Sequence, residues 1–178
     1  PMYRRQDASE KLGAPGVPPF TRGTTIRDGS MDAWDVRALH EDPDVEFTKK
    51  AVIADLERGV TSLWLRVGAD AINPEDIAGD LKDVLLDLAK VEVSSRDDQE
   101  AAAEALLKVY ADSKIEPDKL SFNLGLDPIG FAALNGGTPD LSGMGEWVRK
   151  IEKYKNSRAF VVDATIYHNA GAGDVHEL

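Results

Sequence analysis

Apolar and polar positions alternate in two distinct patterns along most of this chain. Apolar residues at helical spacing predict four helices, at residues 44–57, 73–88, 97–110 and 141–154. Short apolar runs predict four strands, at residues 62–67, 90–94, 120–124 and 159–166. A regular alternation of strands and helices is typical of parallel β/α units, so the sequence predicts an α/β fold with a parallel sheet.

The ends of the predicted helices carry local signals of their own. Asp44 and Asp97 supply acidic starts, which the helix dipole favours. Asn73 is predicted to cap the second helix, with Pro74 in its first turn. A further helix is predicted to begin at Asp174, directly after a Gly-Ala-Gly turn.

The alternation fits both a doubly wound sheet and a closed (β/α)8 barrel. Four predicted strands cannot close an eight-stranded barrel, so a barrel interpretation makes residues 44–178 about half of one. Such a half has two unpaired sheet edges, and we expect it to self-associate or to need a partner. A self-contained α/β domain that ends at residue 178 is a further interpretation, which monomeric, cooperative unfolding would support.

Residues 1–43 differ from the rest of the chain and are predicted to form an extended N-terminal arm. The first 40 residues show no helical or strand periodicity and are rich in Gly, Pro and Arg. Three prolines lie in Gly13–Phe20, which therefore forms neither a helix nor a central strand. Long segments of this kind are usually functional or disordered.

Composition narrows the classes of function. A net charge of −11 argues against nucleic acid or an anionic membrane as the main partner. Cysteine is absent, which excludes disulfides, thiolate metal sites and a cysteine nucleophile, and is compatible with the cytosol. No apolar run approaches the ~20 residues of a membrane span, and the N-terminus does not resemble a signal peptide. We therefore expect a cytoplasmic protein with no nucleic-acid or membrane partner.

Tyr167, His168 and Asn169 form a polar tip after the predicted strand 159–166. Parallel α/β proteins bind ligands at the carboxyl ends of their strands. An imidazole near neutral pH acts as a general acid or as a hydrogen-bond donor to a carbonyl, so His168 is the leading candidate for chemistry. The alternative is a structural histidine whose ring binds carbonyls of its own loop.

The other candidate groups have structural alternatives. The guanidinium groups of the N-terminal arginines could bind phosphates, because their fork of N–H donors suits oxyanions. Ion pairs with nearby aspartates are an equally good interpretation. The arginines are Arg4, Arg5, Arg22, Arg27 and Arg37. His40 is predicted to be solvated or to cap a helix, and Trp64 and Trp147 are predicted to lie in the core. The sequence has neither a glycine-rich phosphate loop nor a metal-binding constellation, so residue types alone name no reaction.

Four longer segments carry a resemblance to a known family. They are Val-Pro-Pro-Phe-Thr-Arg-Gly at 17–23, Trp-Asp-Val-Arg-Ala-Leu-His-Glu-Asp at 34–42, Asn-Leu-Gly-Leu-Asp-Pro-Ile-Gly-Phe at 123–131, and Ile-Tyr-His-Asn-Ala-Gly-Ala-Gly-Asp at 166–174. Together they resemble the small (β) subunit of methylmalonyl-CoA mutase, of actinobacterial type, over nearly the whole chain. The family fold is a (β/α)8 barrel followed by a flavodoxin-like cobalamin domain. The resemblance therefore implies the arm, residues 1–43, and the first half of the barrel, residues 44–178.

The large subunit of that family is the catalytic one, and it interconverts methylmalonyl-CoA and succinyl-CoA by radical chemistry with adenosylcobalamin. Its Arg-Pro-Trp-Thr-Ile-Arg-Gln-Tyr motif supplies a catalytic tyrosine, and Leu39 occupies that position here. A small serine on the first barrel strand corresponds to about Trp64. A glutamine and an arginine correspond, without gaps, to about Gly125 and Asn135. The resemblance thus implies that most catalytic positions have changed.

The Tyr-His pair of the family is retained as Tyr167 and His168, which we interpret as remnants. The resemblance implies a non-catalytic small subunit of a heterodimeric mutase, whose large-subunit partner binds adenosylcobalamin. No cofactor, metal or catalytic residue is expected on this chain. Asp174-Val-His176 begins the Asp-x-His-x-x-Gly pattern of cobalamin binding, which is not completed here, and we interpret it as a chance match. Arg22 and Arg37 are candidates for substrate binding. The alternative is an acyl-CoA-binding regulatory or residual-activity subunit that uses His168.

Overall fold

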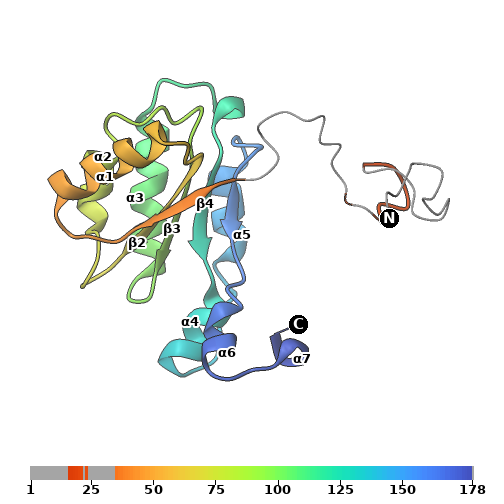
Figure 1. The fold of residues 1–178 in the computed structure, drawn as a ribbon. Coiled ribbons are helices and arrows are strands. Elements are labelled where there is room, and N and C mark those ends of the chain that lie inside the picture. The colour runs from red at the N-terminus through yellow and green to blue at the C-terminus, as the bar shows by residue number, and fades with distance from the viewer. Residues whose placement is uncertain (1–15, 22, 24–34, 178) are drawn as a thin grey trace, which may run out of the picture. The chain divides into compact units, whose positions relative to one another are not determined.

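Five parallel strands form one sheet, in the order β1-β2-β3-β4-β5 (Figure 1). The strands are β1 (Arg37–His40), β2 (Ser62–Val67), β3 (Lys90–Ser95), β4 (Phe122–Leu126) and β5 (Arg158–Phe160). The computed structural model describes residues 16–21, 23 and 35–177, of which 176 and 177 are described by their backbone alone. Residues 1–35 and 36–178 are separate units, and the sheet belongs to the second. The predicted parallel α/β fold is confirmed.

Helices alternate with these strands. The α-helices are α1 (Val45–Glu57), α2 (Ile77–Asp80), α3 (Gln99–Asp112), α4 (Pro128–Asn135), α5 (Met144–Ile151), α6 (Thr165–Asn169) and α7 (Asp174–Glu177), and the 3-10 helices are η3 (Pro74–Asp76) and η4 (Pro117–Lys119). Asp44 caps α1 and Asp98 caps α3. Each carboxylate accepts a hydrogen bond of 2.9 Å from the backbone N–H three residues later, which satisfies one of the free donors at the helix start.

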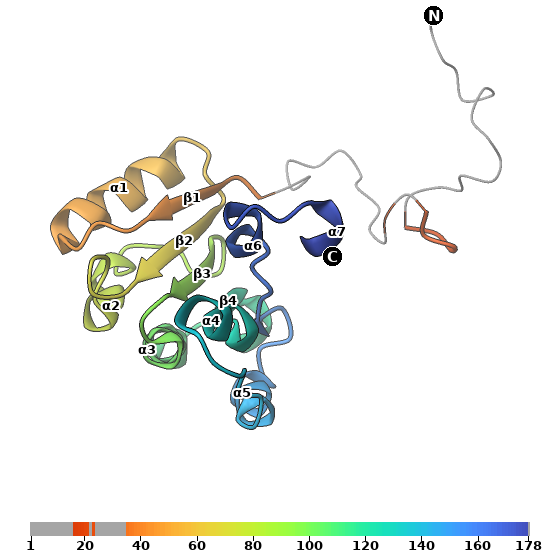
Figure 2. The ribbon, with the colours of Figure 1, turned by 90° about the horizontal axis from the view of Figure 1, so that it is seen from below.

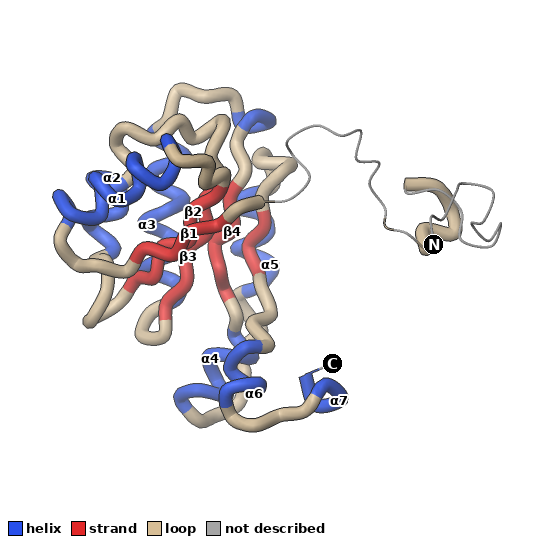
Figure 3. The backbone as a smooth tube through the Cα atoms, in the orientation of Figure 1, coloured by secondary structure: helices blue, strands red, loops and turns tan. Residues whose placement is uncertain are grey.

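The core lies between one face of the sheet and the helices. Successive strand residues point to opposite faces, and on β2 the buried set is Leu63, Leu65 and Val67. Helices α1, α2, α3 and α5 cover this face (Figures 2 and 3). At the end of the core the ring of Tyr110 stacks on Phe122, with their centroids 4.4 Å apart. Burial of each large apolar side chain contributes about 1.5–3 kcal/mol to folding.

The remaining strand residues point to the opposite face of the sheet. On β2 these are Ser62, Trp64 and Arg66, which alternate with the core residues. In a parallel β/α barrel the helices cover the outer face of the strands, and side chains of the inner face fill the barrel. The one-sided helix layer is therefore compatible with part of a TIM-type barrel. We call the face with Trp64 the inner face.

Strand β1 was not among the predicted strands. The sequence places Arg37–His40 in a segment without periodicity, yet the segment pairs in parallel with β2, with Leu39 opposite Trp64. Four residues are too few to show a period of two. The prediction that His40 is solvated or caps a helix is wrong, because its side chain is buried on the helix side of the sheet.

The predicted helix over residues 73–88 is also wrong beyond its first turns. The helical segments η3 and α2 end at Asp80, and residues 81–89 form turns. Leu81, Val84 and Leu86 are buried, whereas Leu88 is 73% exposed. The buried residues Val84 and Leu86 are two positions apart, so they cannot share a helix face, and this segment packs as irregular chain.

The predicted strand 159–166 is shorter than expected. Strand β5 ends at Phe160, residues 161–164 lack regular structure, and α6 begins at Thr165. Helix α4 was not predicted, although Asp127 caps it and Pro128 occupies its first position. Helix α7 begins at Asp174, as predicted.

The described part of the first unit is a local turn. The backbone N–H of Gly16 donates to the carbonyl of Gly23 at 2.9 Å, and that of Phe20 donates to Val17 at 2.9 Å. The Pro18–Pro19 peptide bond is cis. Residues 16–20 thus form neither a helix nor a strand, as predicted, and residues 13–15 lie outside the described residues.

Candidate functional site

A cleft of about 320 Å³ lies where the carboxyl ends of β2, β3 and β4 meet helices α4 and α6. Trp64 and Ser94 come from the inner face of the sheet, and Ile166 comes from α6. Because all strands are parallel, their carboxyl ends converge at one edge, where α/β proteins place their ligands. The cleft therefore lies at the edge of the sheet where a ligand is expected, although none of Tyr167, His168 and Asn169 lines it.

Polar side chains of the inner face are bound to one another. Trp64 Nε1 donates to Ser94 Oγ at 2.7 Å. Arg37 reaches across β2, with Nε donating to Ser62 Oγ at 3.1 Å and Nη1 paired with Glu92 Oε2 at 2.5 Å. These contacts join β1, β2 and β3 on the side of the sheet away from the helices. They also place a large aromatic side chain on the wall of the cleft.

A second ion pair lies on the same inner face. Arg66 forms an ion pair with Glu41, the residue that follows β1. The Arg66 guanidinium also lies over the Trp64 ring, 5.9 Å from its centroid, which is within the range of a cation–π interaction. Trp64 is thus fixed from two sides, by a hydrogen bond and by a stacked cation.

Asp127 organises the wall of the cleft opposite the sheet. Its side chain is buried, and its two oxygens accept from Gly130 N at 2.8 Å and from Asp163 N at 3.0 Å. Its own N–H donates to Gln99 Oε1 at 2.9 Å. One carboxylate therefore joins the start of α4 to the chain that leaves β5. Gly130 cannot carry a larger side chain, because an added Cβ would lie 2.3 Å from Asp127 Oδ2.

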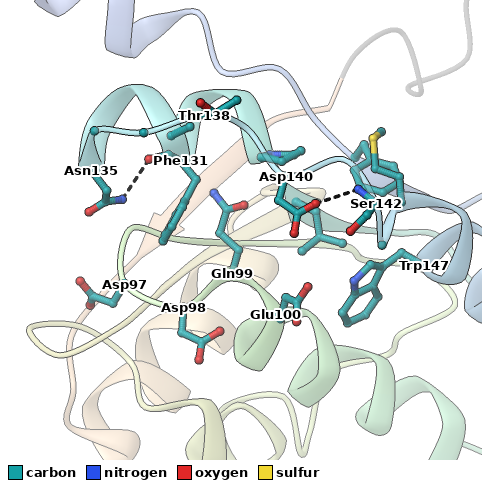
Figure 4. A pocket seen from close by; sticks show the side chains of 18 residues that line it. Asp97, Asp98, Gln99, Glu100, Phe131, Asn135, Thr138, Asp140, Ser142 and Trp147 are labelled. Carbon is teal, nitrogen blue, oxygen red and sulfur yellow. Dashed lines mark hydrogen bonds between the residues drawn. The ribbon is translucent and has the colours of Figure 1, made fainter.

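A larger pocket, of about 540 Å³, lies outside this cleft between the start of α3, helix α4 and the start of α5. Its apolar lining residues include Phe131, Trp147 and Phe160. Figure 4 shows the rings of Phe131 and Trp147, which we call its floor. Gln99 and Phe131 line both the pocket and the cleft, so they form the partition between the two. We call this space the helix-side pocket.

His40 belongs to neither space. Its Nε2 lies 3.6 Å from Asp55 Oδ2 of α1 and makes no hydrogen bond within the described residues. Burial lowers the pKa of His40, and the charge of Asp55 partly opposes this effect. Within residues 16–21, 23 and 35–177, no group of three or more His, Asp or Glu side chains is placed to hold a metal ion. No described helix is long and apolar enough to cross a membrane.

Comparison with known proteins identifies relatives. Over its full length the chain is 64% identical to the methylmalonyl-CoA mutase small subunit of Propionibacterium freudenreichii subsp. shermanii. It is 36% identical to the protein of the same name from Streptomyces virginiae, again over its full length. It is 29% identical, over 99% of its length, to a probable methylmalonyl-CoA mutase small subunit of Mycobacterium tuberculosis. No family model matches the chain.

The chain is homologous to a segment of methylmalonyl-CoA mutase small subunits. This confirms the resemblance noted in the sequence. The chain spans only 28% of the length of the first of these relatives and 29% of the second. The sheet described above lies within this shared segment, and the activity of the whole relative does not follow from the segment alone.

The structure moves the retained Tyr-His pair away from a strand tip. Tyr167 and His168 lie on α6, where Tyr167 is half-buried and His168 is exposed. Neither residue lines the cleft, although their neighbours Thr165 and Ile166 do. The placement of the pair directly after a buried strand is corrected, because four residues without regular structure separate β5 from α6. Their role remains a hypothesis.

Two of the positions that the resemblance aligns with catalytic residues, Leu39 and Trp64, lie on the inner face. Leu39 of β1 is 41% exposed and lies opposite Trp64 of β2. The prediction that Trp64 lies in the core is wrong, since it is half-buried in the cleft wall, whereas Trp147 is buried as predicted. Gly125 has a φ of 65°, and an added Cβ there would lie 1.7 Å from Val93 O. No side chain fits at that position.

The remaining candidates are separated. Asn135 ends α4, where its Nδ2 donates to Phe131 O at 3.0 Å, and it lines the helix-side pocket rather than the cleft. Arg37 lies at the amino end of β1 and is paired with Glu92. Four further arginines lie outside the described residues, and these are Arg4, Arg5, Arg22 and Arg27. The side chain of His176 is likewise not described.

Sequence reasoning missed Asp127 and Glu92, which both line the cleft. The role of Asp127 had a local signal, because Asp before Pro is a frequent helix start. The pairing of Arg37 with Glu92 had no local sequence signal, since it joins residues 55 positions apart across an intervening strand. Such a contact becomes visible only when the order of the strands is known.

Proposed function

We propose that the chain acts as the non-catalytic small subunit of a heterodimeric, adenosylcobalamin-dependent methylmalonyl-CoA mutase. The large subunit carries the interconversion of methylmalonyl-CoA and succinyl-CoA and binds the cofactor. The chain contributes a β/α structural partner, in the cytoplasm, and performs no turnover of its own. The names of its relatives support the small-subunit assignment.

The filled inner face is the observation that carries the non-catalytic assignment. Trp64 occupies the wall of the cleft and is fixed by Ser94 and Arg66. Leu39, beside it, has no phenol to direct a reactive intermediate by a hydrogen bond. A substrate in the place of the indole would have to displace it and break its hydrogen bond to Ser94. These features support a structural role.

Assembly with a large subunit is the direct test of the proposal. A tagged form of the chain is co-expressed with a methylmalonyl-CoA mutase large subunit and purified through the tag. We expect the two chains to elute together from a size-exclusion column in equal amounts. Separate elution at micromolar concentration contradicts the proposal. Calorimetric titration of the chain with succinyl-CoA, and separately with adenosylcobalamin, is expected to give no heat of binding.

An acyl-CoA-binding subunit that uses His168 is the competing function. Here the reconstituted complex is assayed with His168→Ala, and with Asn169→Ala as a matched control on the same exposed end of α6. The structural role predicts that both variants retain full mutase activity, because His168 does not line the cleft. A tenfold or greater loss with His168→Ala alone supports the competing function, since general acid catalysis contributes about 10²-fold or more.

A further inference from the structure

The helix-side pocket combines an apolar floor with an acidic rim. The floor carries the rings of Phe131 and Trp147, and Trp147 is only 6% exposed. The rim carries the carboxylates of Asp98, Glu100 and Asp140. Figure 4 shows Asp98 and Glu100 on the α3 side and Asp140 on the opposite side, in the segment that connects α4 to α5. The volume of about 540 Å³ falls within the range of about 300–1,000 Å³ typical of small-molecule sites.

The residues that line this pocket include no Lys, Arg or His. Lys150 lies on the same helix as Trp147 and is not among the described lining residues. Its Nζ is bound to Glu104 Oε1 at 3.0 Å and lies over the Trp147 ring, 3.9 Å from its centroid. The charged side chains of the described lining are therefore all acidic. The adjacent cleft differs, because Arg66 and Arg96 are among the residues that line it.

Backbone hydrogen bonds hold two of these carboxylates in place. Asp98 Oδ1 accepts from Ala101 N at 2.9 Å, and Asp140 Oδ1 accepts from Ser142 N at 2.9 Å. The bond from Ser142 also lowers the pKa of Asp140, so this carboxylate is charged at neutral pH. Each bond uses one oxygen, and a carboxylate has a second oxygen with which to accept from a ligand.

We propose that the helix-side pocket is a binding site for a small organic cation, an ammonium or guanidinium group on an apolar body. The apolar body fills the space over Phe131 and Trp147, and the cation meets the carboxylates of Glu100 and Asp140 at the rim. This site is separate from the cleft, from which Gln99 and Phe131 divide it. It stands whether or not the chain assembles with a large subunit.

Charge and apolar contact contribute in different ways to this binding. Burial of a phenyl-sized body supplies most of the affinity, because aromatic groups bury a large apolar area. Rim carboxylates are exposed, so each adds a small amount that salt screens. The structure thus predicts selectivity for cations over isosteric neutral molecules and anions, and a loss of that selectivity at high salt.

The test uses 4-phenylbutylamine as the probe, with 4-phenylbutan-1-ol and 4-phenylbutyrate as its neutral and anionic counterparts. Binding to the full chain is measured by protein-detected NMR at low ionic strength. We expect saturable shifts of the Trp147 indole signal with the amine, at least fivefold weaker binding of the alcohol, and none of the carboxylate. Raising the salt concentration should reduce the difference in affinity between the amine and the alcohol.

Variants separate the rim from the floor. Glu100→Gln combined with Asp140→Asn removes two charges, while both side chains keep an oxygen that accepts hydrogen bonds, and should weaken amine binding about fivefold or more while the alcohol is unchanged. The charge-matched control is Glu57→Gln combined with Asp87→Asn, which removes two exposed acids outside the pocket lining and should leave amine binding unaltered. Ala132→Leu places extra carbons in the pocket and should weaken both probes.

Three outcomes overturn the proposal. The amine gives no saturable shift up to millimolar concentration, or the alcohol binds as tightly as the amine, or the rim variant binds the amine as well as the control does. Circular dichroism of each variant establishes that it is folded. The rim variant carries the test if Ala132→Leu proves unstable, since its two substitutions lie on the surface.

Discussion

Asp80 is a carboxylic acid buried in an apolar environment. Its side chain is 1% exposed, at the end of α2, and neither carboxylate oxygen has a hydrogen-bond partner within the described residues. Burial, together with the nearby charge of Asp76, raises the pKa of Asp80 to about 6 from an ordinary value of 3.8. An ionised carboxylate is costly in such a place, so at neutral pH the fold carries a local penalty.

The sign of this effect predicts a dependence of stability on pH. The folded-state pKa lies above the unfolded one, so the unfolded chain releases this proton first as the pH rises. Asp80 therefore costs nothing below pH 3.8, and its cost grows towards pH 6 and is complete above it. Asp80→Asn should raise the free energy of unfolding at pH 7.5 by up to about 3 kcal/mol and change it little at pH 4.

Urea unfolding of wild type and variant at the two pH values measures this difference. Asp87→Asn, on the exposed surface of the following turns, is the matched control and should leave stability within about 0.5 kcal/mol at both pH values. An equal increase in the free energy of unfolding from Asp80→Asn at pH 4 and at pH 7.5 would show that the carboxyl group does not have a raised pKa.

At the scale of single elements, the sequence predicted best where one face of an element is buried in a regular pattern. Helix α3 and strand β2 follow that rule, and their predicted positions agree with the structure within two residues. Strand β1 is too short to show a pattern. The turn after α2 buries residues at irregular spacing. Periodicity cannot predict such segments, because tertiary packing decides them.

Leu86 and Leu88 distinguish the observed turn from the helix expected over residues 73–88. A helix with Leu81 and Val84 on its buried face would bury Leu88 and expose Leu86. The structure has the reverse, with Leu86 8% exposed and Leu88 73% exposed. We expect Leu86→Ala to lower the free energy of unfolding by about 2–4 kcal/mol and Leu88→Ala by less than about 0.5 kcal/mol. Chemical denaturation measures both values. A larger loss of stability from Leu88→Ala than from Leu86→Ala would support a helix over residues 73–88 instead.

The candidate site was also predicted only in part from the sequence. The carboxyl ends of parallel strands are the expected place for a ligand, and the sequence analysis used this rule to select the tip after residues 159–166. Which side chains meet there was not predicted, because α6 replaces the end of the expected strand and removes His168 from the cleft wall. The changed positions Leu39 and Trp64 do lie side by side, since both point to the inner face from neighbouring strands.

At the scale of the whole molecule, the sheet has two outer strands. Within the described residues β1 pairs only with β2, and β5 pairs only with β4, so each has one row of backbone groups outside the ladder. Leu39 adds an exposed apolar side chain to the β1 edge. Edges of this kind pair with other chains unless charge or proline prevents it. The two edges therefore favour association between copies of the chain.

We accordingly expect the chain on its own to self-associate as its concentration rises. Sedimentation velocity from micromolar to hundreds of micromolar should show a shift to larger species, and Leu39→Lys should reduce it by placing a charge on the β1 edge. Phe47→Lys is the control, because Phe47 is 60% exposed and belongs to helix α1 rather than to an outer strand. A monomer at every concentration would mean that the edges are protected. An equal effect of the two variants would mean that exposed apolar surface in general, and not the edge of the sheet, drives association.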